Sequence, residues 1–141
     1  VEKMCVGPGR NAMDEGEFLV SIKLPLKNSS FSASYERFIP RNEMDIAVAA
    51  VASSVSLENG KISSCRIGLA AVGPTPIFAE EASELLIGKE PSEENIKNAS
   101  NKAKELASPI SDMRGTVEHR KDLIEVLTRR TLSKAVERVG V

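Results

Sequence analysis

The segment KISSCRIGLAAVGPTPIFAEEASELLIG, residues 61–88, decides the fold. It follows Asn59-Gly60, a dipeptide typical of two-residue β-hairpin turns, and its first ten residues are typical of a β-strand. Gly73-Pro74 then breaks the strand. Thr75-Pro76 fits the N-cap and first position of a helix, and Gly88 fits its end. The segment therefore predicts an α+β domain, but it indicates no chemistry.

Two extended runs are expected upstream. From Glu17 to Leu24, apolar and other residues alternate with a period of two, as in a half-buried strand, and Pro25 ends the run. Residues 27–30 are a polar link and the best candidate for a domain boundary. Phe31–Phe38 is the second run, with Phe31, Ala33 and Tyr35 on one side.

Residues 44–57 can be read in two ways. Their alanine content fits a helix, but the Asn59-Gly60 turn that follows favours the first strand of a hairpin. The expected cross-strand pairs are Glu58 with Lys61, Leu57 with Ile62, and Ala52 with Ile67. We expect the small side chains of both strands, including Ala49, Ala52 and Gly68, to let a layer of helices approach closely.

Two further helices are predicted after residue 88. Ser92 fits the N-cap of the first helix, which Ser108-Pro109 ends, and Thr116 fits the N-cap of the second. Strands grouped before helices favour an α+β sandwich. The expected fold is an antiparallel sheet of three to four strands followed by three helices packed on one face.

Size and charge exclude several classes of protein. The chain of 141 residues and 15.2 kDa suits a single core, and its 19 basic and 20 acidic residues disfavour a nucleic-acid partner. No apolar run approaches the roughly 20 residues of a membrane span, and no secretory leader is recognised. We therefore expect a cytoplasmic protein. The start at Val1 leads us to expect a processed or trimmed chain.

The candidate chemical motifs are weak. Gly7, Gly9 and Ala12 match a loose dinucleotide-binding spacing, but no helical pattern follows them, so we reject that reading. Cys5 and Cys65 are too far apart for a zinc ribbon or an iron–sulfur cluster, and we expect two free thiols.

His119 and Asp112 are the remaining candidates for catalysis. A small enzyme using both is an alternative only if the fold brings their side chains together in a pocket. A turn held by Asp112 and a structural His119 is the preferred interpretation. We predict no catalytic residue and no metal site.

Three blocks resemble a known family: FSASYERFIPRNEMDIA (residues 31–47), IGLAAVGPTPIFAEEASELLIG (67–88) and ASPISDMRGTVEHRKDLIEVLTRRTL (107–132). They are similar to the C-terminal domain of the FAD-binding (medium) subunit of molybdenum hydroxylases, the carbon monoxide dehydrogenase and xanthine dehydrogenase family. On this resemblance, residues 1–29 are the tail of the preceding FAD-binding domain plus a linker, and residues 30–141 are the C-terminal domain.

The resemblance implies a role beside a flavin. In such complexes electrons pass from the molybdenum centre through [2Fe–2S] clusters to FAD. The C-terminal domain covers the flavin and docks on the partners: the molybdopterin-binding large subunit, the [2Fe–2S] small subunit and the N-terminal FAD-binding domain. Tyr35 matches an aromatic residue that flanks the flavin, and Arg37 stands where many relatives carry Lys.

Two consequences follow from the resemblance. We expect the isolated chain to be inactive and not to retain FAD, which the full-length subunit would bind. The alternative is a stand-alone protein-interaction module that shares the fold and never meets a flavin.

Overall fold

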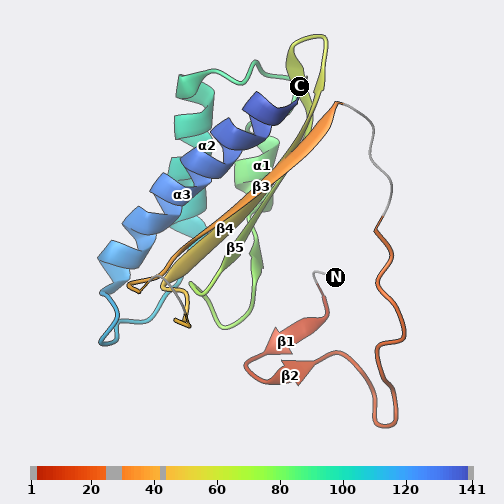
Figure 1. Ribbon diagram of the computed structural model, residues 1–141, viewed down its shortest axis with the longest axis vertical. Coiled ribbons are helices and arrows are strands. Elements are labelled where there is room, and N and C mark those ends of the chain that lie inside the picture. Colours follow the sequence, from red (N-terminus) through yellow and green to blue (C-terminus); the bar gives the residue numbers. More distant parts are fainter. Residues whose placement is uncertain (1–2, 25–29, 42–43, 140–141) are drawn as a thin grey trace.

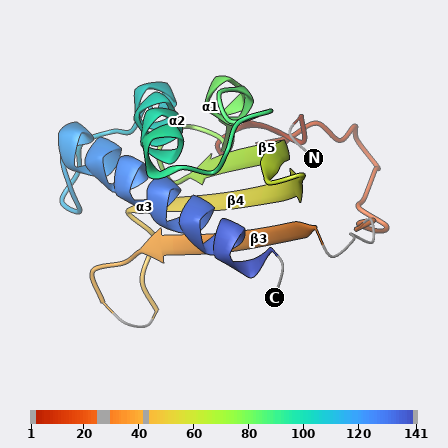
Figure 2. The same ribbon diagram turned by 90° about the horizontal axis from the view of Figure 1, so that it is seen from above.

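The computed structural model describes residues 3–24, 30–41 and 44–139 (Figure 1). A four-stranded antiparallel sheet forms its centre, in the order β3 (Phe31–Phe38), β4 (Ala49–Glu58), β5 (Lys61–Ala70) and β6 (Ile77–Phe78). The described residues form three helices: α1 (Glu80–Glu84), α2 (Glu93–Leu106) and α3 (Val117–Arg138). The helices lie on one face of the sheet (Figure 2), which confirms the predicted α+β arrangement.

A second, two-stranded sheet lies apart from the helices (Figure 1) and consists of β1 (Cys5–Gly7) and β2 (Arg10–Asn11). Pro8 and Gly9 connect the two strands, and Gly9 has a φ of 66°, which glycine adopts without strain. The glycines that match a dinucleotide spacing therefore belong to a hairpin.

The β4–β5 hairpin turns at Asn59-Gly60, as predicted. Asn59 and Gly60 have φ values of 51° and 75°, the left-handed pair that a type I′ turn requires. Beside the turn, Glu58 pairs with Lys61 and Leu57 pairs with Ile62, which confirms the start of the expected register.

Further from the turn the predicted register is wrong by one residue. The ladder is irregular between Ser56 and Leu57, so that Ala52 pairs with Gly68 and not with Ile67. A bulge adds one residue to a strand and shifts every later pair. Ala52 and Gly68 consequently lie on the face away from the helices, which corrects the expectation that they serve helix packing.

The helix predicted from Thr75 is also wrong at its start. Residues 77–78 form β6 against β5, and α1 begins only at Glu80. Two hydrogen bonds hold this arrangement: the Ala79 N–H donates to the Ile67 carbonyl over 2.9 Å, and the Ile67 N–H donates to Ser83 Oγ over 3.1 Å. The pairing of β6 with β5 thus outweighs the local tendency of Thr75-Pro76 to begin a helix.

The strand predicted at Glu17–Leu24 is not formed. The segment has no ladder partner among the residues that the structure describes, and Phe18, Val20 and Leu24 are exposed. Alternation shows which side chains a strand would bury, but it does not supply the partner. The predicted boundary after residue 29 falls at residues 25–29, outside the described ranges.

Both longer helices begin where their caps predict. Ser92 Oγ accepts a hydrogen bond from the Asn95 N–H, and Thr116 Oγ1 accepts one from the His119 N–H. The core lies between these helices and the sheet, and includes Val51, Val55, Ile62, Ile67, Leu69, Ile124 and Leu132. Each such side chain contributes about 1.5–3 kcal/mol by leaving water.

The two cysteines are free thiols, as predicted. Cys5 is exposed and Cys65 is buried in the core, where burial raises the pKa of its thiol to about 12. Among the described residues, none of the helices combines the length and apolar character that a bilayer-crossing segment needs.

Candidate functional site

The sheet face opposite the helices, here called the open face, is built from small side chains at its centre. Ala33 on β3, Ala52 and Ser54 on β4, and Gly68 on β5 are cross-strand neighbours there. A Cβ added at Gly68 would meet only the Ala52 carbonyl, at 4.0 Å. The floor of the open face is therefore flat and uncrowded.

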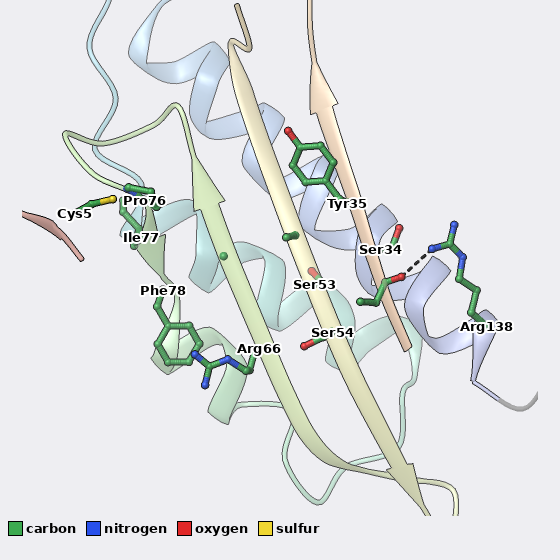
Figure 3. A pocket seen from close by; sticks show the side chains of 13 residues that line it. Cys5, Ser34, Tyr35, Ser53, Ser54, Arg66, Pro76, Ile77, Phe78 and Arg138 are labelled. Carbon is green, nitrogen blue, oxygen red and sulfur yellow. Dashed lines mark hydrogen bonds between the residues drawn. The ribbon is translucent and has the colours of Figure 1, made fainter. Parts of the chain in front are cut away.

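A hollow of about 890 Å³ lies over this floor (Figure 3) and is called the open-face hollow below. Its lining comprises Cys5, Ala33, Ser34, Tyr35, Ala52, Ser53, Ser54, Arg66, Gly68, Pro76, Ile77, Phe78 and Arg138. Its volume is in the range of small-molecule and cofactor sites, about 300–1,000 Å³.

Tyr35 lies on the β3 side of the open-face hollow and is 60% exposed. It pairs with Ala52 of β4, whose methyl group leaves the phenol ring without a bulky neighbour on that strand. A lone tyrosine on a strand is expected to pack into a core. Here most of the side chain is exposed instead.

On the opposite side, Arg66 and Phe78 form a second wall. The Arg66 guanidinium carbon lies 4.3 Å from the centroid of the Phe78 ring, a cation–π contact. Both side chains line the open-face hollow (Figure 3). Sequence reasoning missed this pair because the β5–β6 pairing that joins them was not predicted.

Arg37 lies two residues after Tyr35, on the same side of β3 and exposed. Consecutive residues on one side of a strand are about 6.5–7 Å apart. Arg37 is not among the residues that line the open-face hollow. The fold thus brings the two predicted site residues to one side of β3, with only Tyr35 at the hollow.

The first turns of α3 hold a separate polar cluster around Arg120. Arg120 is 5% exposed, and its Nη2 lies 2.6 Å from Asp112 Oδ1. This ion pair, with a further bond from the Arg114 N–H, holds the pKa of the Asp112 carboxyl below its ordinary value. Asp112 also forms an isolated bridge with Gly115, so the prediction of a turn held by this aspartate is confirmed.

His119 has a different partner from Asp112. Its ring meets the Phe38 ring edge-on, with centroids 6.0 Å apart. Neither His119 nor Asp112 lines the open-face hollow. The alternative of a small enzyme that uses both side chains in a pocket gains no support. No cluster of metal-binding side chains is found within residues 3–24, 30–41 and 44–139.

The basic residues near the end of α3 have specific partners. Lys134 forms an ion pair with Glu36, and Arg138 Nη1 donates to the Ala33 carbonyl over 2.8 Å. Both contacts join α3 to β3. They tie the end of this helix to the strand that carries Tyr35.

Comparison with known proteins identifies the domain. The family model described as CO dehydrogenase flavoprotein C-terminal domain matches residues 34–135. The carbon monoxide dehydrogenase medium chain of Afipia carboxidovorans is 33% identical over 127 residues, which cover 90% of this chain and 44% of that protein. The xanthine dehydrogenase FAD-binding subunit of Escherichia coli O157:H7 is 26% identical, with coverage of 95% and 46%.

The solved structure of reconstituted CO dehydrogenase from Oligotropha carboxidovorans has the same fold, with a TM-score of 0.91 and 31% identity. The match covers 97% of this chain and 48% of that one. The chain therefore spans about half the length of the relatives it matches. The resemblance seen in the sequence is confirmed, and the chain belongs to the family of CO dehydrogenase flavoprotein C-terminal domains.

Proposed function

We propose that this chain acts as the C-terminal domain of the FAD-binding subunit of a molybdenum hydroxylase, where it covers one side of the flavin. The relatives named above are medium chains or FAD-binding subunits, and this chain corresponds to about half of each. The observation that carries the proposal is the exposed Tyr35 beside a flat floor of small side chains.

The open face fits a planar, aromatic group. Tyr35 offers a phenol ring for stacking, and Ala33, Ala52 and Gly68 leave room for a flat ring system above the sheet. Such stacking contributes about 0.5–1.5 kcal/mol beyond the area buried. When bound, FAD supplies electron transfer between the iron–sulfur clusters and an external acceptor.

In this role Arg37 provides a positive charge close to the stacked ring. A cation near the flavin stabilises its reduced, anionic form through Coulomb attraction, which weakens with distance. Arginine keeps the charge that many relatives provide with lysine, but spreads it over a planar group.

The same proposal assigns partners to the whole subunit. The N-terminal FAD-binding domain would hold most of the cofactor, and the molybdopterin-binding large subunit and the [2Fe–2S] small subunit would deliver electrons. The relatives' names support an oxidoreductase of this class.

The first test is the mass and visible spectrum of the natively purified full-length gene product. A polypeptide about twice this size, with flavin bands and both partners, is expected. A colourless 15.2 kDa species that purifies alone would favour the interaction module instead.

Replacement of Tyr35 tests the stacking role. In the full-length subunit, Tyr35→Ala is expected to shift the flavin absorption bands and to weaken FAD retention by about 1 kcal/mol, or roughly fivefold, because a stacking wall is lost. Tyr35→Phe is the matched control, since it keeps the ring, and its spectrum should remain near that of the parent. Identical spectra and FAD affinity for Tyr35→Ala would reject Tyr35 as a flavin contact.

Replacement of Arg37 tests the charge. Arg37→Ala is expected to lower the flavin reduction potential because reduced, anionic flavin loses a nearby cation. Arg41→Ala is the control: Arg41 is an exposed cation four residues later, paired with Asp45, and its loss should leave the potential closer to that of the parent. An unmoved potential in Arg37→Ala would contradict the proposed placement.

A further inference from the structure

The buried Arg120 joins three parts of the chain that are distant in sequence. Its Nη1 donates to the Val48 carbonyl over 2.9 Å and lies 3.4 Å from the Ala71 carbonyl, while Nη2 bonds Asp112. Val48 immediately precedes β4, and Ala71 immediately follows β5. One side chain from the first turn of α3 therefore fastens one end of the central hairpin.

The contact with Val48 continues directly to β3. The Val48 N–H donates to the Phe38 carbonyl over 2.9 Å, so a single residue, Val48, accepts the Arg120 bond and donates a bond to the end of β3. The neighbouring His119 contacts the Phe38 ring from the side. Two consecutive residues of α3 thus hold Phe38, one through the backbone and one through the ring. Arg37 is the residue before Phe38 on β3.

β3 is attached to α3 at two further points. Lys134 pairs with Glu36, and Arg138 donates to the Ala33 carbonyl. In the central sheet β3 is an outer strand, with β4 on one side only. On its other side, the contacts with α3 take the place of a neighbouring strand. Glu36 precedes Arg37 and Phe38 follows it, so Lys134 holds one neighbour of Arg37 directly and Arg120 holds the other through Val48.

The Ala71 contact concerns the opposite wall of the hollow. Ala71 has a φ of 63°, a left-handed conformation that alanine rarely adopts unless its surroundings impose it. The chain then runs to Pro76 and Ile77, which line the open-face hollow. Arg120 thus also helps to fix the start of the segment that forms this wall.

The third polar group of the Arg120 guanidinium is its Nε. Within the part of the chain that the structure describes, its buried Nε has no hydrogen-bond partner. An unpaired buried N–H is unfavourable. The hydrogen bonds of the Arg120 side chain that the structure describes are therefore all made by its two Nη groups.

We infer that Arg120 is a positioning residue for the flavin-facing end of β3: through Val48 and Phe38 it sets where Arg37 stands beside the ring. This inference rests on the proposed function. Because Coulomb energy depends on distance, a looser Arg37 stabilises the reduced flavin less even though its charge is retained.

The test uses the full-length, FAD-loaded subunit and measures flavin reduction potential alongside the thermal midpoint. Arg120→Lys keeps the charge but loses the planar fork that reaches Val48 and Asp112 together. It is expected to lower the potential in the same direction as Arg37→Ala. In the double variant, Arg37→Ala with Arg120→Lys, the potential should equal that of Arg37→Ala alone, because the two residues act in series.

Lys104→Met is the matched control for general loosening of α3. Lys104 ties α2 to α3 through Asp122 and Glu125, away from β3. It should change stability without moving the potential. If Arg120→Lys does not fold, His119→Ala, which removes the exposed ring contact to Phe38, should give a smaller lowering.

Each outcome decides the inference. A lowered thermal midpoint with an unchanged potential in Arg120→Lys, or in His119→Ala if that variant is used, would make the contact purely structural. An equal shift in Lys104→Met would do the same, and so would additive effects in the double variant. If Arg37→Ala itself leaves the potential unchanged, the proposed function fails and this inference with it. A shift in Arg37→Ala without one in Arg120→Lys rejects the inference alone.

Discussion

The two faces of the central sheet differ in the size of the side chains at their centres. Towards the helices, β4 and β5 present Val51, Ile67 and Leu69, each at most 1% exposed. Towards the open face, β4 presents Ala52, the residue after Val51, and β5 presents Gly68, the residue between Ile67 and Leu69. Large apolar side chains identify the face that the chain covers with its own helices. Small side chains line the centre of the face that the helices leave open.

Thiol reactivity should give the largest difference between buried and accessible positions. Cys65 lies in the core with a pKa of about 12, three units above the ordinary value of 9.0, so its thiolate is about 10³-fold scarcer at neutral pH. In the native chain, iodoacetamide should modify Cys5 at least about 10³-fold faster than Cys65. Peptide mass spectrometry measures both rates, and the denatured chain is the control in which both react. Similar native rates would show that the helix-covered face opens readily.

Truncation of large side chains should separate the two faces by stability. Ile67→Ala is expected to lower the free energy of unfolding by about 2–5 kcal/mol, because it leaves a cavity against the helices. Tyr35→Ala removes a larger side chain from the open face and should cost about 0.5 kcal/mol. Urea denaturation of the chain measures both. Comparable losses would mean that Tyr35 also belongs to the core.

The smallest effect concerns the floor of the open face. Gly68→Ala should stabilise the chain by about 0.5 kcal/mol, because glycine is unfavourable inside a strand and the new Cβ has space. Gly60→Ala is the control: at a φ of 75° the alanine is strained and should destabilise by about 1 kcal/mol. Thermal unfolding compares the two. A loss of stability in Gly68→Ala would show that the floor is packed.

Local signals predicted the fold wherever a feature depends on adjacent residues. Ser92 and Thr116 cap their helices, and Asn59-Gly60 turns the hairpin, because each needs only neighbours within a few positions. The helix start expected at Thr75 failed because pairing of β6 with β5 is a tertiary interaction. The predicted pairing of Ala52 was wrong because no local sequence signal indicates the irregularity after Ser56.

The candidate site was predictable only in part. Tyr35 and Arg37 were named through a family resemblance, and the alternation of β3 places both on one side. The Arg66–Phe78 contact required the unforeseen β5–β6 pairing. Arg120 gave no signal because a charged residue near a helix start is expected to be exposed, and its carbonyl partners are 49 and 72 positions away.

The bond between Arg138 and Ala33 bears on whether a further strand can pair with the outer edge of the sheet. A hydrogen bond from the Leu57 N–H to the Ser30 carbonyl sets the alternation of β3, so the Ala33 carbonyl points away from β4. Outward backbone groups on an outer strand invite another molecule to add a strand. Arg138 occupies that carbonyl with a bulky cation, so a strand added at this edge would have to displace it.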